Sequence, residues 1–279
     1  MLEERVYKNK LEAEVKLHGS VKRERNDLLK LYYEFSLCWK YKNIKPSNAF
    51  SDQYNYVTKY FGLTQDPITK DYMIITKYYE TGDLTQYLAK NFFELEWSDK
   101  LKRLNYINDG LKNIHDVNII HQDFHSGNIF NSGEIAIIAF ESSSSDDEIY
   151  GIIPYVAPEI FQGNKYTKAS DIYGFGMIMW EFLTGRRPFW DRSHDVDLII
   201  DICDGLRPPL VTNAPEGYIE LIQECWHPDP NNRLTADDIK SKIEKIIDSE
   251  STANKVLSCS LGYLTKELKW TNLTITINE

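Results

Sequence analysis

The stretch DIYGFGMIMWEFLTG, residues 171–185, is apolar on almost every side when it is read as a helix. A helix at the surface of a soluble domain keeps one polar face toward water, whereas a helix without such a face is buried all round. The stretch therefore predicts a helix at the centre of a domain that surrounds it. A chain of 279 residues, 42% of them hydrophobic, is long enough to form that domain.

Helical spacing continues on both sides of this stretch. Before it, Ser98 is a candidate N-cap for a helix, and one apolar stripe follows, formed by Leu101, Leu104, Ile107, Leu111 and Ile114. After it come VDLIIDIC, YIELIQECW and TADDIKSKIEKIID, the last with Thr235 as cap and Asp238 three residues later. These patterns predict a larger, helical lobe.

Residues 5–78 have a different pattern. NYVTKYFGL and DYMIITKYY are short β-rich runs, and a helix is expected near Asp27 to Lys42. The sequence thus predicts an α+β fold with a small, mostly antiparallel N-terminal lobe at 1–80 and a helical lobe at 81–249. Residues 250–279 form a tail with no assigned role.

Charge and composition argue against several classes of function and location. The net charge of -10 argues against generic binding to nucleic acid or to anionic membranes. The residues after Met1, LEERVYKNK, lack the apolar core of a secretory signal, and no run of about 18 apolar residues follows. Four scattered cysteines without C-x-x-C spacing predict neither a structural metal nor a disulfide framework. We therefore expect a cytoplasmic protein.

Four motifs carry a resemblance to a known family. HQDFHSGN holds Asp123 and Asn128, and it is followed in order by YVAPE at 155–159, SDIYGFG at 170–176 and ECWHPDPNNR at 224–233. Together they resemble a eukaryotic protein kinase domain of the tyrosine-kinase-like branch, from Val6 to about Ile247. The resemblance implies a bilobed kinase-like fold. Alone, Asp123 and Asn128 would also suit an Asx turn, and a binding domain of unrelated origin is the remaining alternative.

The resemblance also implies roles for individual residues. Asp123 would accept the proton of a substrate hydroxyl, and Asn128 would bind magnesium. Lys16 would contact the nucleotide phosphates, or is an ordinary exposed strand lysine. The implied ATP-binding residues are Val6, Lys16, Thr76 as gatekeeper, the hinge residues Lys77, Tyr78 and Tyr79, and Asp83. Two structural contacts are implied as well: Glu159 with Arg233, and Asp171 bracing the catalytic loop.

The phosphate site departs from the family pattern. Where the family has Asp-Phe-Gly, this chain has Ala139, Phe140 and Glu141. Alanine carries no oxygen and cannot bind a hard cation; Glu141 could reach the metal, or it is a solvated loop residue. If Val6 is the valine after the glycine-rich loop, Glu4 replaces the third glycine and the first two fall at or before Met1. The first strand and that loop are then expected to be truncated.

The catalytic loop has altered neighbours too. Gln122 stands where the family has arginine, so docking of a phosphorylated activation loop should be lost. His125 stands where serine/threonine kinases often carry a lysine that contacts phosphate. Glu34 is the candidate helix partner of Lys16, but a solvated helix face is the favoured reading of this residue.

The sequence therefore leads to two functional hypotheses. The first is a pseudokinase with weak or absent binding of ATP and Mg²⁺, which signals by contacting other signalling proteins, such as a kinase or a substrate protein. The second is an active, atypical Ser/Thr or Tyr protein kinase that uses Glu141, or manganese held by Asn128 alone. Binding of nucleotide that depends on a divalent metal separates the two.

Overall fold

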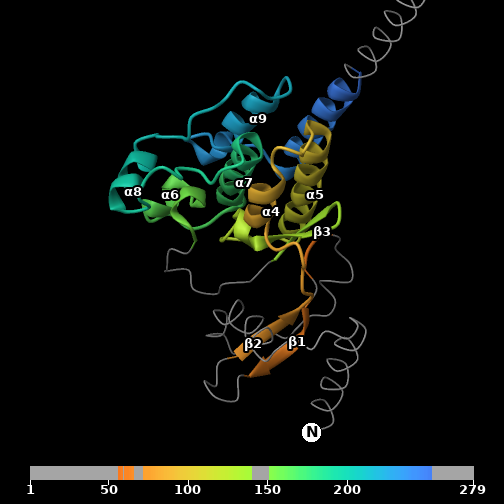
Figure 1. The fold of residues 1–279 in the computed structure, drawn as a ribbon. Coiled ribbons are helices and arrows are strands. Elements are labelled where there is room, and N and C mark those ends of the chain that lie inside the picture. Colours follow the sequence, from red (N-terminus) through yellow and green to blue (C-terminus); the bar gives the residue numbers. More distant parts are fainter. Residues whose placement is uncertain (1–55, 59, 66–71, 140–150, 253–279) are drawn as a thin grey trace, which may run out of the picture.

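The computed structural model describes residues 56–58, 60–65, 72–139 and 151–252. A small two-stranded sheet lies apart from a larger helical part, and the segment at 77–83 leads from the sheet into the helical part (Figure 1). Several predicted features lie outside the described residues: Val6, Lys16, Glu34, the helix near 27–42, Phe140, Glu141 and the tail.

The described part of the N-terminal lobe is an antiparallel hairpin. Strand β1 (Tyr60–Gln65) pairs with β2 (Tyr72–Thr76), with an irregular register between Tyr60 and Gly62. This confirms the antiparallel pairing expected for these two runs. The predicted lobe boundary at residue 80 falls between β2 and helix α4 (Leu84–Asn91).

Helix α7 (Lys168–Thr184) lies at the centre of the helical lobe. Thr167 and Ser170 form a capping box at its start, and Gly185, with φ of 71°, ends it in the left-handed conformation. Every residue from Ser170 to Leu183 is buried, as the sequence predicts. A helix this apolar is stable only inside such a core.

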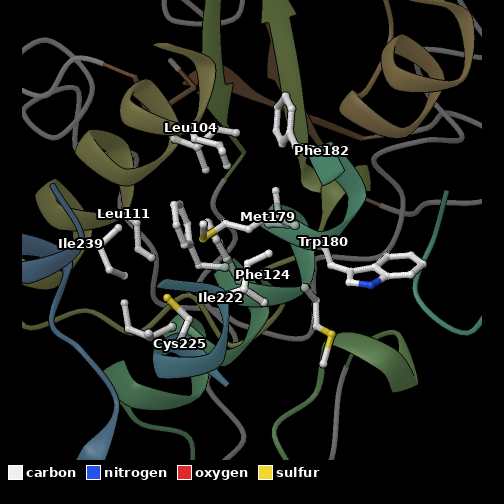
Figure 2. Close-up of a cluster of buried hydrophobic side chains, with 14 of the residues drawn as sticks. Leu104, Leu111, Phe124, Met179, Trp180, Phe182, Ile222, Cys225 and Ile239 are labelled. Atoms are coloured by element: carbon white, nitrogen blue, oxygen red, sulfur yellow. The ribbon is translucent and has the colours of Figure 1, made fainter. Parts of the chain in front are cut away.

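Three other helices surround α7. They are α5 (Trp97–Asp116), α9 (Tyr218–Cys225) and the helical residues 236–252. Figure 2 shows Leu104 and Leu111 of α5, Ile222 of α9 and Ile239 converging on Met179 and Phe124. All five residues of the predicted α5 stripe are fully buried, which confirms that stripe.

Two glycines let neighbouring segments lie directly on α7. A Cβ added at Gly174 would lie 2.5 Å from the carbonyl oxygen of Phe124, and one at Gly176 would lie 3.0 Å from the Cβ of Cys225. The segment that holds Phe124 is therefore seated on the backbone of α7, closer than any side chain would allow.

The remaining elements frame the site. Strands β3 (Ile129–Ser132) and β4 (Ile135–Ile138) form a hairpin beside α5. Helix α6 (Pro158–Phe161) contacts α8 (Val196–Cys203), and α8 has its own small apolar cluster with Phe189. Short 3-10 turns cover Ser126–Asn128, Ile153–Tyr155 and Pro230–Asn232.

The segment before β1 is anchored to the helical lobe. The carbonyl of Tyr56 accepts a hydrogen bond of 2.8 Å from the Ile138 amide, and the Thr58 amide donates one of 2.8 Å to the Ile138 carbonyl. The Tyr56 ring stacks on Tyr106 with centroids 5.1 Å apart. A Cβ at Gly110 would lie 2.8 Å from the Tyr56 carbonyl oxygen, so only glycine permits this close contact.

One predicted cap is wrong and one is confirmed. Helix α5 begins at Trp97 with Glu96 as N-cap, so Ser98 lies inside the first turn. The early start lets the Trp97 ring pack edge-on against Tyr218, with centroids 4.8 Å apart. The Thr235 hydroxyl accepts a hydrogen bond from the Asp238 amide, and the Asp238 carboxylate accepts one from the Thr235 amide. These two bonds confirm Thr235 as the predicted cap. No helix in the described ranges is long and apolar enough to cross a membrane.

Candidate active site

The buried helix α7 holds the loop at 121–128 through one carboxylate. Asp171 Oδ2 accepts from the His121 amide at 2.8 Å, and Oδ1 accepts from the Gln122 amide at 2.9 Å. Oδ2 also lies 2.8 Å from Nε2 of His115, on α5. Gln122 has φ of 67°, a strained value for glutamine, and these bonds fix the loop in that conformation. The predicted bracing role of Asp171 is confirmed.

Asp123 and Asn128 face each other across this loop. Asn128 Nδ2 donates to the carbonyl oxygen of Asp123 at 2.9 Å and to Asp123 Oδ2 at 3.0 Å. His125 accepts from the Gly127 amide through Nδ1, and its Nε2 lies 3.4 Å from Asp123 Oδ1. The Asp123 side chain remains 43% exposed, so a substrate group could still reach it.

The surroundings keep Asp123 ionised. Burial raises the pKa of Asp123, but the hydrogen bond from His125, the two neighbouring imidazoles and the Asn128 amide outweigh it, so that the pKa lies below its usual value. Burial lowers the pKa of His121, although the nearby charge of Asp171 acts in the opposite direction. The loop thus presents a carboxylate that is able to accept a proton.

Ala139 stands directly beside Asn128. The β3–β4 register pairs Ile129 with Ile138, and the next amide, that of Ala139, donates to the Asn128 carbonyl at 2.8 Å. The Ala139 carbonyl lies 2.8 Å from Nε2 of His121. Glu134 is exposed in the turn at the far end of the hairpin. The described part of the hairpin therefore brings no carboxylate to Asn128.

The predicted hinge residues follow directly after β2. Thr76 is buried, Lys77 and Tyr78 are exposed, and Tyr79 is buried with its ring stacked on Phe130 of β3 at 5.2 Å and 13°. Sequence reasoning missed Phe130, although its place two residues after Asn128 at the start of a strand was a usable signal. Asp83, predicted to bind the cofactor, caps α4: its Oδ1 accepts from the Gln86 amide at 2.8 Å.

The sequence profile of the protein tyrosine and serine/threonine kinase family matches residues 49–243, more than half of the chain. The chain belongs to this family. It is 28% identical to ephrin type-A receptor 5 of Gallus gallus over 205 residues and 30% identical to the ephrin type-B receptor 2 of that species, also over 205 residues. It is 32% identical over 192 residues to the probable serine/threonine-protein kinase roco5 of Dictyostelium discoideum.

These matches cover different shares of the proteins compared. They span 69%, 68% and 61% of this chain, but only 20%, 20% and 7% of the respective relatives. The shared part is the kinase domain, of the tyrosine-kinase-like branch, with its bilobed α+β fold. Within this kinase domain the structure brings Asp123, Asn128 and Ala139 together and places Tyr79, a predicted hinge residue, beside Phe130. The other predicted residues, Val6 and Lys16, lie outside the described residues.

A second buried contact of the kinase domain joins its distant motifs. The Arg233 guanidinium donates to both oxygens of Glu159, at 2.6 and 2.7 Å, and also to the carbonyls of His227 and Ala169. The predicted pairing of YVAPE with the last arginine of the ECWHPDPNNR motif is thereby confirmed. Its role is structural.

Sequence reasoning missed a buried polar network behind the catalytic loop. The Tyr155 hydroxyl donates to Glu181 Oε1 at 2.7 Å and lies 3.3 Å from Ser126 Oγ, which lies 2.7 Å from Thr85 Oγ1. Burial raises the pKa of Glu181 to about 7, even though Tyr155 and Ser126 stabilise the carboxylate. A glutamate inside an otherwise apolar helix was the available signal.

Glu181 should make the stability of this kinase domain depend on pH. Its pKa rises from 4.5 to about 7 on folding, so the folded state binds more protons between these values. The free energy of unfolding should therefore fall as the pH rises through this window, by about 3 kcal/mol in total. Urea unfolding at several pH values measures this dependence. Glu181→Gln should remove most of the fall in the free energy of unfolding with pH, whereas the control Glu220→Gln, at an exposed position, should show the same fall as the parent. Equal slopes for Glu181→Gln and the parent would contradict the assignment.

Proposed function

We propose that this chain is a pseudokinase, a kinase domain that signals by binding other proteins rather than by transferring phosphate. The observation that carries the proposal is the place of Ala139. Its main chain bonds to Asn128 and His121 and so holds this position beside the catalytic loop, but its side chain offers no oxygen.

The donor set does not fit magnesium. Mg²⁺ requires an octahedral shell of oxygen ligands and is held in proteins by carboxylates. In the described residues, the atoms near this place are the amide of Asn128 and the carboxylate of Asp123, which are hydrogen-bonded to each other. No group of three or more His, Cys, Asp or Glu in the described residues could hold a metal ion.

Weak metal binding has a large consequence for phosphoryl transfer. The reaction depends on positioning and on neutralising charge that develops on the phosphate, and the metal supplies much of that neutralisation. Removing one preorganised stabilising group costs about 3–4 kcal/mol in other enzymes, or roughly a hundredfold to a thousandfold in rate. Asp123 retains its position and charge, but nothing described beside it would hold the phosphate donor.

An active atypical kinase is the second candidate. The feature that favours it is the intact Asp123–Asn128 pair, with Asp123 ionised and accessible. It would need Glu141, or manganese held by Asn128, in place of the missing aspartate.

The decisive measurement is thermal unfolding of the full chain with ATP, with and without Mg²⁺ or Mn²⁺. We expect no rise in melting temperature that requires the metal. Ala139→Asp should create such a rise, because the contacts at position 139 use only the main chain, whereas Ala139→Asn should not. Metal-dependent stabilisation of the parent chain, together with phosphate transfer that Asp123→Asn abolishes, would establish the active kinase instead.

The partners follow from the same proposal. A kinase domain without transfer activity acts through its surface, and we propose signalling proteins in the cytoplasm, such as another kinase or a substrate protein, as partners. The free thiols of Cys203 and Cys225 agree with a reducing compartment.

A further inference from the structure

Helix α8 presents an apolar ridge to solvent. Val196 and Ile200, one turn apart, are 68% and 52% exposed. The opposite side of the helix is fully used, because Leu198 and Ile202 are completely buried against Phe189. Large β-branched residues contribute little to helix stability at exposed positions, so nothing in the fold of the lobe requires an apolar outer face here.

A stripe of carboxylates runs beside this ridge. Asp197, Asp201 and Asp204 recur at i, i+4 and i+7 and therefore line one side of the helix. Asp201 pairs with Arg192, while Asp197 and Asp204 are exposed and make no ion pair within the described residues. Like charges at this spacing repel one another and destabilise a helix.

The charges at the end of α8 also oppose its dipole. Asp201 lies in the last turn and Asp204 is the C-cap, and no basic residue lies in that turn. Arg207 donates to the Ile202 carbonyl, but it does so beside the ring of buried Tyr173 and forms no ion pair with Asp204. A cation approaching from outside would relieve both the repulsion and the unfavourable dipole interaction.

We infer that the outer face of α8 docks a basic, amphipathic segment of a partner protein, with apolar side chains on Val196 and Ile200 and lysines or arginines on Asp197 and Asp204. The inference rests on the proposed protein-binding function and gives it a place and a partner chemistry. The small ridge indicates a transient contact rather than a permanent complex.

The test uses a fluorescent synthetic peptide of leucine and lysine at amphipathic helical spacing, titrated with the full chain and followed by anisotropy. Val196→Ser with Ile200→Ser should weaken binding on the order of tenfold. Asp197→Asn with Asp204→Asn should do the same and reduce the dependence on salt. Val211→Ser, which alters a valine that is 44% exposed outside α8, should bind like the parent.

Three outcomes of the peptide titration would overturn the inference: no binding, equal binding of a scrambled peptide of the same composition, or equal binding by the α8 variants. Self-association in sedimentation that Val196→Ser with Ile200→Ser abolishes would assign the face to a second copy and also overturn it. Thermal unfolding of each variant checks that it is folded. The ATP measurement is independent, so failure of the peptide test leaves the pseudokinase proposal intact, and metal-dependent ATP binding leaves the docking result intact.

Discussion

Replacing Arg233 by methionine should lower the free energy of unfolding by about 3–5 kcal/mol. The guanidinium neutralises Glu159 through two short bonds and satisfies two further carbonyls, and neither side chain of the pair is more than 9% exposed. Its loss leaves a buried carboxylate without a counter-charge. Urea unfolding followed by far-ultraviolet circular dichroism measures the change.

A double-mutant cycle separates the pair from its surroundings. Glu159→Met combined with Arg233→Met should be less destabilised than the Arg233 variant alone, because no unpaired charge remains. Lys242→Met breaks a surface bridge to Glu224 in which both side chains are 40% exposed, and it should change stability by only about 0–1 kcal/mol. If Arg233→Met lowers the free energy of unfolding no more than Lys242→Met does, the Arg233–Glu159 contact does not stabilise the fold.

Asp171→Ala should destabilise the chain by about 3–5 kcal/mol and release the catalytic loop. The substitution leaves two main-chain amides and the buried His115 without their acceptor, and each such loss costs about 1–3 kcal/mol. Gln122 would then lose the bonds that hold its strained conformation. Hydrogen exchange of the His121 and Gln122 amides, measured by nuclear magnetic resonance, reports the release directly.

Two comparisons make this prediction specific. Asp171→Asn keeps one acceptor oxygen and should fall between the parent and the alanine variant. Asp99→Ala removes a half-exposed aspartate from the first turn of α5 and should change stability by less than about 1 kcal/mol. If the two amides exchange equally in the parent and in Asp171→Ala, this carboxylate is not what fixes the loop.

The sequence predicted the helical lobe well because its signals are local and strong. Residues 171–185 are apolar all round because every face of that helix is buried, and α5 has an apolar stripe because one of its faces is buried. The Glu159–Arg233 pair and the Asp171 brace were anticipated from the resemblance to protein kinases, on the residues of the matching motifs. These charged residues are buried, and a buried charge has few possible partners within a core.

The remaining features depend on tertiary contacts that no local pattern specifies. Ser98 is a reasonable cap, but α5 begins at Trp97, whose ring packs on the distant Tyr218. The Tyr155–Glu181 bond and the Tyr79–Phe130 stack join segments distant in the chain, so their partners became visible only in three dimensions. The resemblance assigned Asp83 to ATP binding. In the structure its side chain caps α4 by accepting a hydrogen bond from the Gln86 amide.

The two hydrogen bonds of Ala139 do not involve its side chain, so the fold at this position does not depend on whether the side chain can bind a metal. Both are made by peptide atoms, which every residue except proline possesses, so the hairpin keeps its shape whichever side chain stands there. A change from aspartate to alanine at such a point can silence a phosphotransferase in one step without weakening the protein that carries it. The reverse substitution is equally short, and it too would leave the main-chain bonds of the hairpin in place.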